Sequence, residues 1–99
     1  MSRLDILVTY DVETQDKSGQ RRLRRVATIC QNFGQRVQKS VFECRVTQQQ
    51  LEEMMHQLTQ VVDKERDSLR IYLLHGNRDN VVWVYGRDDY VDFEEPLIF

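Results

Sequence analysis

The hydrophobic positions of this 99-residue chain follow two periods, and segments with each period alternate along it. Asp5–Asp11 is a short apolar run rich in β-branched residues, which predicts a strand covered on at least one side. Similar extended runs occupy residues 35–46, 68–74 and 81–85. Because 35–46 is long for one strand, we expect two antiparallel strands there, with a break near Gln38–Ser40.

Two other segments have the period of an amphipathic helix. In residues 20–33, apolar side chains recur at helical spacing, and Gly34 is typical of the position after a helix end. This apolar stripe consists of Leu23, Val26, Ala27, Cys30 and Phe33. Thr47–Gln50 has the pattern of a capping box and predicts the start of a second helix. His56 projects away from the apolar stripe of that helix, so we expect it on the surface and not as a ligand.

The predicted order is β-α-β-β-α-β, followed by further extended segments. Two right-handed crossovers then place both helices on one face of a four-stranded sheet. The predicted fold class is therefore α+β, a ferredoxin-like βαββαβ sandwich. We expect a single domain over residues 1–99, with a core at about 3–85 and a C-terminal tail at about 86–99. The sheet face without helices needs a cover wherever it carries apolar side chains.

The C-terminal tail is the candidate for part of that cover. It is acidic up to Glu95 and ends in Pro96-Leu97-Ile98-Phe99, whereas polar residues are usual at a frayed terminus. A proline is tolerated at the start of an edge strand. We expect this C-terminal strand to join the sheet of a partner subunit, in a homodimer; the alternative is that the tail packs on its own core. Size favours a partner, since a chain this short buries only about 60–65% of its unfolded surface.

Composition excludes several classes of protein. With 40% hydrophobic residues, 30% charged residues and one proline, the chain is neither collagen-like nor of low complexity. No apolar run approaches the roughly 20 residues that span a bilayer, and no signal peptide is apparent, so we expect a cytoplasmic protein without membrane contact. Cys30 and Cys44 fit neither a disulfide scaffold nor a zinc pattern. We expect Cys30 to be buried and unreactive, whereas Cys44 could be half-exposed.

Charge is divided unevenly along the chain. Residues 1–50 contain nine basic and five acidic residues, and residues 51–99 contain five basic and eleven acidic ones, for a total of −2. Four arginines, Arg21, Arg22, Arg24 and Arg25, open the first predicted helix, with Arg22 at the border of the apolar stripe. Mutual repulsion and the positive end of the helix dipole both disfavour such a cluster unless an anion binds. The cluster therefore favours phosphate contact, and a merely solvated helix face is the alternative.

Asp11 ends the first predicted strand, directly before a crossover. Ligands of open α/β sheets lie outside the carboxyl ends of strands, although a single Asp there is often only a turn or cap residue. One carboxylate holds Mg²⁺ poorly because the ion demands octahedral oxygen ligation. Two Asp11 side chains that face each other across a two-fold axis would do so. Glu13 and Asp16 in the following loop are weaker candidates, and no P-loop, GxGxxG motif or nucleophilic triad is apparent.

Several segments together resemble one known family. These segments are Tyr10–Val12, Arg21–Ala27, Gly34–Cys44, Asp67–Tyr72 and Glu95–Phe99. Over nearly its whole length the chain resembles the small CRISPR-associated adaptation endonucleases, the second of the two universal Cas proteins, and in particular members of subtype I-C. The stretch 77–92 is the least similar part.

The resemblance implies a ferredoxin-like homodimer in antiviral defence, with Mg²⁺-dependent endonuclease activity on RNA or double-stranded DNA. It also implies a partnership with the larger adaptation integrase during spacer capture. Asp11 matches the family's ligand for Mg²⁺ or another divalent ion such as Mn²⁺. Arg36 and Phe42 match positions near the active cleft, and Arg21 or Arg22 match basic positions for nucleic acid. With Tyr10, which adjoins the metal ligand, our candidate catalytic residues are Asp11, Tyr10, Arg36 and Phe42. Our candidate nucleic-acid contacts are therefore Arg21, Arg22, Arg24, Arg25 and Arg36.

Three functions agree with these residues. In the first, Mg²⁺ between paired Asp11 carboxylates promotes hydrolysis of a phosphodiester whose backbone is positioned by Arg36 and the helix arginines. In the second, the same dimer is a non-catalytic scaffold that binds duplex DNA and holds the integrase. A ribonuclease toxin on the same fold is a third, weaker alternative. The sequence leaves RNA and DNA open as substrates because both carry the phosphate that arginine recognises.

Overall fold

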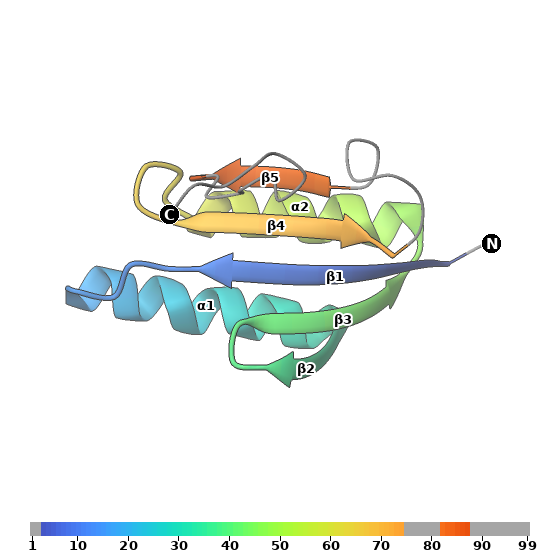
Figure 1. Ribbon diagram of the computed structural model, residues 1–99, viewed down its shortest axis with the longest axis horizontal. Coiled ribbons are helices and arrows are strands. Elements are labelled where there is room, and N and C mark those ends of the chain that lie inside the picture. Colours follow the sequence, from blue (N-terminus) through green and yellow to red (C-terminus); the bar gives the residue numbers. More distant parts are fainter. Residues whose placement is uncertain (1–2, 75–81, 88–99) are drawn as a thin grey trace, which may run out of the picture.

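The computed structural model describes residues 3–74 and 82–87 and has the predicted order of elements, including a fifth strand at the extended run predicted over residues 81–85. The elements are β1 (Leu4–Asp11), α1 (Lys17–Phe33), β2 (Gly34–Gln38), β3 (Val41–Val46), α2 (Gln48–Val61), β4 (Ser68–Leu73) and β5 (Val82–Gly86). They form one antiparallel sheet of order β2-β3-β1-β4-β5, with both helices on the same side (Figure 1). The α+β ferredoxin-like prediction is confirmed, and β5 extends the sheet beside β4.

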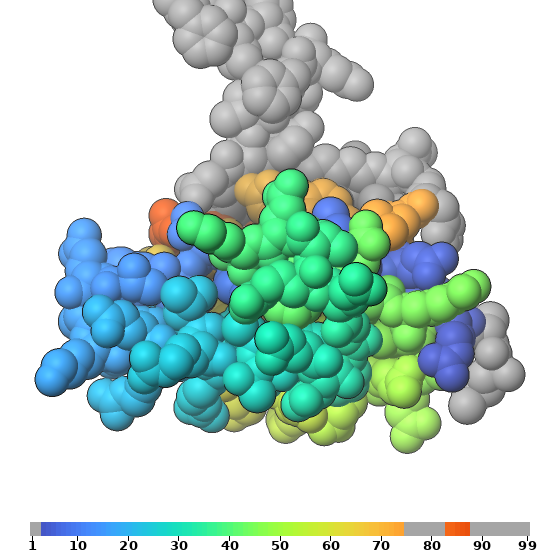
Figure 2. Space-filling model, turned by 90° about the horizontal axis from the view of Figure 1, so that it is seen from below, coloured from blue at the N-terminus to red at the C-terminus, as the bar shows by residue number. Residues whose placement is uncertain are grey.

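The central strand β1 divides its side chains between the two faces of the sheet. Ile6, Val8 and Tyr10 are buried under the helices, and Val8 lies opposite Phe42 on β3 and Ile71 on β4. Burial of each large aliphatic side chain stabilises the fold by about 1.5–3 kcal/mol. The core therefore lies between β1, its two neighbouring strands and the helices. In Figure 2, α1 (blue to cyan) and the β2–β3 pair (green) form one continuous surface beside this core.

The face without helices carries the alternate residues. Its members on β1 are Asp5, Leu7, Thr9 and Asp11, and cross-strand neighbours on it are Glu43, Arg70 and Tyr72. This open face is thus a mixture of charged, polar and apolar side chains, not a continuous apolar patch. Of the tail that we expected at about 86–99, Gly86 ends β5 and Arg87 follows it, whereas residues 88–99 lie outside the described residues.

Helix α1 begins earlier than the hydrophobic pattern predicted. The carboxylate of Asp16 caps it by accepting a hydrogen bond from the Gly19 backbone N–H at 2.8 Å, so Ser18 and Gly19 lie in its first turn and not in a loop. That bond, followed by one from the Ser18 hydroxyl, lowers the pKa of Asp16. As a consequence, the arginines from Arg21 onward lie beyond the first turn, where the helix dipole opposes them less than expected.

The prediction for Gly34 is correct in its place at the end of α1 but not in the backbone conformation that it adopts. It follows the end of α1 at Phe33, as predicted, and its N–H donates to the Cys30 carbonyl, so only the left-handed conformation typical of such a glycine is absent: Gly34 is extended, with φ −166°, and begins β2. Glycine is needed there for another reason: an added Cβ would collide with the side chain of Cys44 and the carbonyl of Glu43 on β3. Close approach of two strands, and not turn geometry, therefore explains this residue.

Other local predictions are confirmed. The two strands predicted within residues 35–46 are β2 and β3, and they are joined by a turn at Lys39–Ser40. Thr47 and Gln50 form a reciprocal capping box, with hydrogen bonds of 3.1 Å and 2.9 Å. His56 is exposed on α2. In the described part of the chain, no helix has the length and apolar character needed to cross a membrane.

Both cysteines are buried in the core, so the prediction that Cys44 could be half-exposed is wrong. Burial raises the pKa of Cys30 to about 12 and that of Cys44 to about 11. Both thiols therefore stay protonated at neutral pH and are inert as nucleophiles.

Candidate functional site

Asp11 lies at the carboxyl end of β1, on the open face, and its side chain is 73% exposed. Its Oδ2 accepts a hydrogen bond at 3.2 Å from Nη2 of Arg87, which directly follows β5. Arg87 is itself anchored, because its backbone N–H donates to the carbonyl of Asp67 at 2.9 Å and its own carbonyl accepts from the Ser68 hydroxyl at 2.6 Å. The predicted metal ligand thus lies beside a positioned guanidinium.

A single chain offers few further ligands at this place. Asp11 shares a hollow of about 290 Å³ with Glu13, Glu65, Arg66 and Arg87. Within the described residues, no three His, Cys, Asp or Glu side chains are grouped so that they could hold a metal ion. The exposed Asp11 carboxylate is a hard oxygen ligand of the kind that Mg²⁺ prefers, but in one copy it is one ligand of the several that the ion requires.

Tyr10 and Phe42 lie on the other face of the sheet from Asp11. Phe42 is completely buried and Tyr10 nearly so, with their ring centroids 6.2 Å apart. The Tyr10 hydroxyl donates to the Lys39 carbonyl at 3.4 Å, and burial raises the pKa of Tyr10. Because alternate residues of a strand point to opposite faces, this geometry does not bring either ring to the Asp11 carboxylate. Their placement favours a supporting role in the core, and the catalytic role assigned from the resemblance stays a prediction.

Arg36 lies on the edge strand β2, where its guanidinium carbon is 5.2 Å from the centre of the Phe42 ring. The residue is exposed, so its guanidinium stacks on the aromatic face and is also accessible to solvent. Arg36 therefore links the core aromatics to the surface, and it is the member of this group that an external phosphate could reach.

The four helix arginines do not share one environment. Arg21, Arg24 and Arg25 are exposed on the outer side of α1, as predicted. Arg22 turns inward, and its Nε donates to Oδ2 of Asp67 at 2.9 Å. Since an intramolecular carboxylate already occupies this guanidinium, the geometry favours a structural role for Arg22 over the predicted phosphate contact.

Comparison with known proteins places this arrangement in a family. The model of the family described as CRISPR associated protein Cas2 matches residues 5–82. This chain belongs to the Cas2 family. It is 50% identical over 93 residues to the "CRISPR-associated endoribonuclease Cas2 1" of Moorella thermoacetica, which covers 94% of this chain and 97% of the relative. It is 51% identical over 94 residues to the "CRISPR-associated endonuclease Cas2" of Halalkalibacterium halodurans, covering 95% and 98%.

Solved structures agree with this assignment. The crystal structure of Streptococcus pyogenes Cas2 at pH 6.5 has a TM-score of 0.69 and 49% identity, and the match covers 78% of this chain and 93% of that one. A second structure, described as that of a hypothetical protein from Thermus thermophilus, has a TM-score of 0.66 and 32% identity over 76% of this chain and 85% of that one. The fold of this chain is therefore the fold of Cas2.

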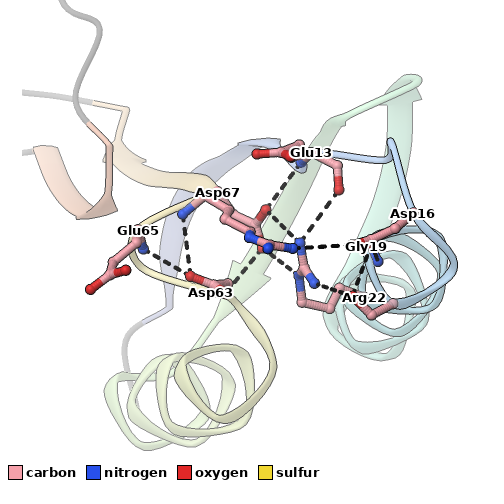
Figure 3. A network of polar contacts seen from close by, with 9 residues as sticks. Glu13, Asp16, Gly19, Arg22, Asp63, Glu65 and Asp67 are labelled. Carbon is pink, nitrogen blue, oxygen red and sulfur yellow. Dashed lines mark hydrogen bonds and ion pairs between the residues drawn. The ribbon is translucent and has the colours of Figure 1, made fainter.

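The Asp11 end of this Cas2 chain is held in place by a buried carboxylate that the sequence analysis missed. Asp67 is completely inaccessible to solvent, and Figure 3 shows the donors that surround it. Its Oδ1 accepts from the Glu13 backbone N–H at 3.0 Å and from Nη2 of Arg22 at 3.3 Å. Its Oδ2 accepts from Nε of Arg22 and from the Asp63 backbone N–H, each at 2.9 Å. Both carboxylate oxygens therefore have two donors each.

These contacts determine the titration of the pair. Burial by itself would raise the pKa of Asp67, but hydrogen bonds from Arg22 and from the backbone of Asp63 and Glu13 outweigh it and hold that pKa below its usual value. The hydrogen bond to Asp67 in turn raises the pKa of Arg22. In the sequence, the one signal for this pair is the position of Arg22 at the border of the apolar stripe.

We expect Asp67→Asn to lower the free energy of unfolding by about 3 kcal/mol at pH 7, since it removes one charge of a buried ion pair. Because the folded-state pKa of Asp67 is depressed, its stabilisation is present above the unfolded-state pKa of about 3.9 and is lost as the pH falls through the folded-state value. Urea unfolding at pH 7 and between pH 5 and 2 measures both effects. Arg21→Gln is the control, and a loss below about 1 kcal/mol for Asp67→Asn would contradict this account.

Proposed function

We propose that this Cas2-family chain is a metal-dependent endonuclease that hydrolyses phosphodiester bonds of RNA or double-stranded DNA in CRISPR adaptation. The observation that carries the proposal is the exposed Asp11 carboxylate at the carboxyl end of the central strand, with the Arg87 guanidinium 3.2 Å away. Metal-dependent hydrolysis of a phosphodiester needs an anionic ligand for the metal ion and a cation near the phosphate, and this pair of side chains offers both. The names of two relatives, one an endoribonuclease and one an endonuclease, support this class of reaction and leave the nucleic acid open.

The proposed active unit is a homodimer that brings two Asp11 side chains together across the open face. Two observations support it: Asp11 lies on the sheet face that the described helices leave uncovered, and that face also carries the apolar side chains Leu7 and Tyr72. We further propose that the tail, residues 88–99, joins the partner's sheet, as its apolar end suggests. A second copy would supply the additional carboxylate that a divalent cation requires.

The proposed cofactor is Mg²⁺, or another divalent ion such as Mn²⁺. When bound, such an ion would polarise the phosphoryl group and lower the pKa of a water molecule. The chain's own residues then have separate tasks. Asp11 provides the oxygen ligand, and the Arg87 guanidinium, which donates a hydrogen bond to that carboxylate, competes with the ion for it. Arg36 and the exposed Arg21, Arg24 and Arg25 bind the backbone phosphates, to which guanidinium groups are well matched.

Asp11→Asn tests the catalytic role directly. Removing a residue that hydrogen-bonds to a metal ligand typically lowers metal affinity or activity by about 10- to 100-fold. Replacement of the ligand itself is therefore expected to lower Mg²⁺-dependent cleavage by at least about 100-fold. Labelled RNA and duplex DNA are incubated with each variant, with Mg²⁺ or with EDTA, and light scattering reports the dimer. Asp5→Asn, on the same strand and the same face, is the matched control and should cleave normally. Undiminished cleavage by a clean Asp11→Asn preparation would refute the proposed chemistry.

Arg87→Ala examines the contact that accompanies the candidate ligand. Because the pair is solvent-exposed and worth little on its own, removing the guanidinium should lower the Mg²⁺ concentration for half-maximal cleavage by only about two- to fivefold. Arg87→Lys, which keeps the charge, should show a smaller change. A Mg²⁺ titration of cleavage measures this shift. If Arg87→Ala instead raises that concentration, the guanidinium stabilises the metal-binding geometry and does not compete with the ion.

A non-catalytic scaffold is the second candidate function. In this proposal the dimer binds duplex DNA and holds the larger adaptation integrase, and one observation favours it: a single chain places one acid for a metal, and Arg87 already contacts that acid. Spacer acquisition in cells that carry Asp11→Asn separates the two roles. Normal spacer acquisition by this variant would show that the scaffold is the function in the cell, which we propose to be exerted in the cytoplasm. The likeness to subtype I-C stays a proposal, which the neighbouring genes would test.

A further inference from the structure

A groove of about 550 Å³ lies between α1 and α2, outside the Asp11 site. Its wall on α1 carries Arg21, Arg24 and Arg25. These residues are spaced at i, i+3 and i+4, so the three side chains gather within about one helical turn. The volume is within the range of about 300–1,000 Å³ that is typical of ligand sites. We call this feature the α1–α2 groove.

Among the described residues, no acid pairs with the three arginines of the groove. Other described arginines have such a partner: Arg22 pairs with Asp67, Arg66 with Asp16 and Arg45 with Asp5. In the described part of the chain, by contrast, no ion pair is found for Arg21, Arg24 or Arg25. Three guanidinium groups within one turn repel one another, and an external anion would remove that repulsion.

The opposite wall, on α2, supplies neutral donors. It consists of His56, Gln57 and Gln60, with Ile29 and Val61 as the apolar lining. No carboxylate of the residues that the structure describes lines the groove. The arginines, His56 and Gln60 carry N–H groups that can donate to a ligand, whereas the Thr28 hydroxyl already donates to the Arg24 carbonyl and Gln57 Nε2 to the Glu53 carboxylate. Arginine and glutamine are both common donors to the phosphate oxygens of nucleic acids. The two walls together are therefore complementary to a chain of phosphates.

We propose that the α1–α2 groove binds the phosphodiester backbone of a nucleic acid and is a second binding site in addition to the Asp11 site. The inference rests on the proposed function for its class of ligand. It deepens that function by adding the side chains of α2 to the interface. The end of β1 at Asp11, the start of α1 and the end of α2 lie at the same end of the molecule (Figure 1), with the Asp11 side chain on the open face of the sheet and the groove on its helical side.

An acidic protein segment is a poorer match to the same charges. Protein interfaces depend on buried apolar or aromatic anchors at their centre. The apolar lining of the groove is limited to Ile29 and Val61, and Val61 is only 8% exposed. Recognition in the groove therefore rests on charge and hydrogen bonding, which a phosphate backbone supplies without an apolar anchor.

Two variants on opposite walls test the groove. Arg25→Gln removes a cation from α1, and Gln60→Glu adds an anion to α2 in a side chain of nearly the same shape. Gln49→Glu is the matched control, because it makes the same charge change at an exposed position of α2 outside the groove. All variants are made in the Asp11→Asn background and measured in EDTA, so binding is read without cleavage. The ligands are fluorescent single-stranded RNA, single-stranded DNA and duplex DNA, with poly-glutamate as competitor.

Arg25→Gln and Gln60→Glu should each weaken binding by about three- to tenfold, whereas Gln49→Glu should stay within about twofold. The slope of log affinity against log salt should fall by about 0.7 for single strands or about 0.9 for duplex for each lost phosphate contact, and so show which form occupies the groove. Equal effects of Gln60→Glu and Gln49→Glu would overturn the inference, as would unchanged binding by both groove variants. Competition by poly-glutamate as strong as by nucleic acid would assign the groove to an acidic protein instead.

The test of the groove can succeed or fail independently of the test of catalysis at Asp11. If Asp11→Asn does not reduce cleavage but the groove variants weaken binding, the proposed chemistry fails and the groove remains. If Asp11→Asn abolishes cleavage and the groove variants bind normally, only the groove is refuted. When the groove variants are made in the chain that retains Asp11, loss of the groove contacts should raise the KM of cleavage and leave kcat unchanged, because the groove lies away from the reacting phosphodiester.

Discussion

One buried carboxylate positions the functional end of this molecule. Asp67 has no access to solvent, and a buried charge is tolerated only when its hydrogen bonds are satisfied. Its four donors come from three places: the segment after β1, helix α1 and the connection between α2 and β4. Glu13, one of these donors, is two residues beyond Asp11, and the Asp67 carbonyl accepts from the backbone of Arg87. The same residue therefore locates both partners of the Asp11–Arg87 pair.

The arginines at the start of α1 lie in two different environments, one largely buried against Asp67 and one exposed to solvent. Arg22 is 86% removed from solvent at its side chain, being 14% exposed, and its charge neutralises Asp67. Arg21 and Arg25, one residue before it and three after it, are exposed and line the α1–α2 groove. A helix rotates by about 100° per residue, so neighbours in such a cluster necessarily face different environments. Stability therefore depends on one member of this run, and the proposed anion binding depends on others.

The sheet separates packing from chemistry in a similar way. Tyr10 and Asp11 are adjacent in the sequence, yet one lies in the core and the other on the open face, because side chains alternate along a strand. Arg36 connects the core to the surface, since its guanidinium stacks on the buried Phe42 ring while the residue itself lies on the exposed edge strand. A substitution at Phe42 would therefore also change the surroundings of the Arg36 guanidinium at the surface.

The sequence by itself determined the features that depend on near neighbours: the order of strands and helices, the capping box at Thr47, and the placement of Asp11 at the end of a strand. Periodicity and caps act over three or four residues and can be read directly. Only the tertiary structure decided that Arg22 pairs with Asp67, 45 residues away, that Gly34 makes room for β3, and that the α1 arginines face His56 and the glutamines of α2. These contacts join segments distant in the sequence, and their partners are fixed by the way the helices cross the sheet.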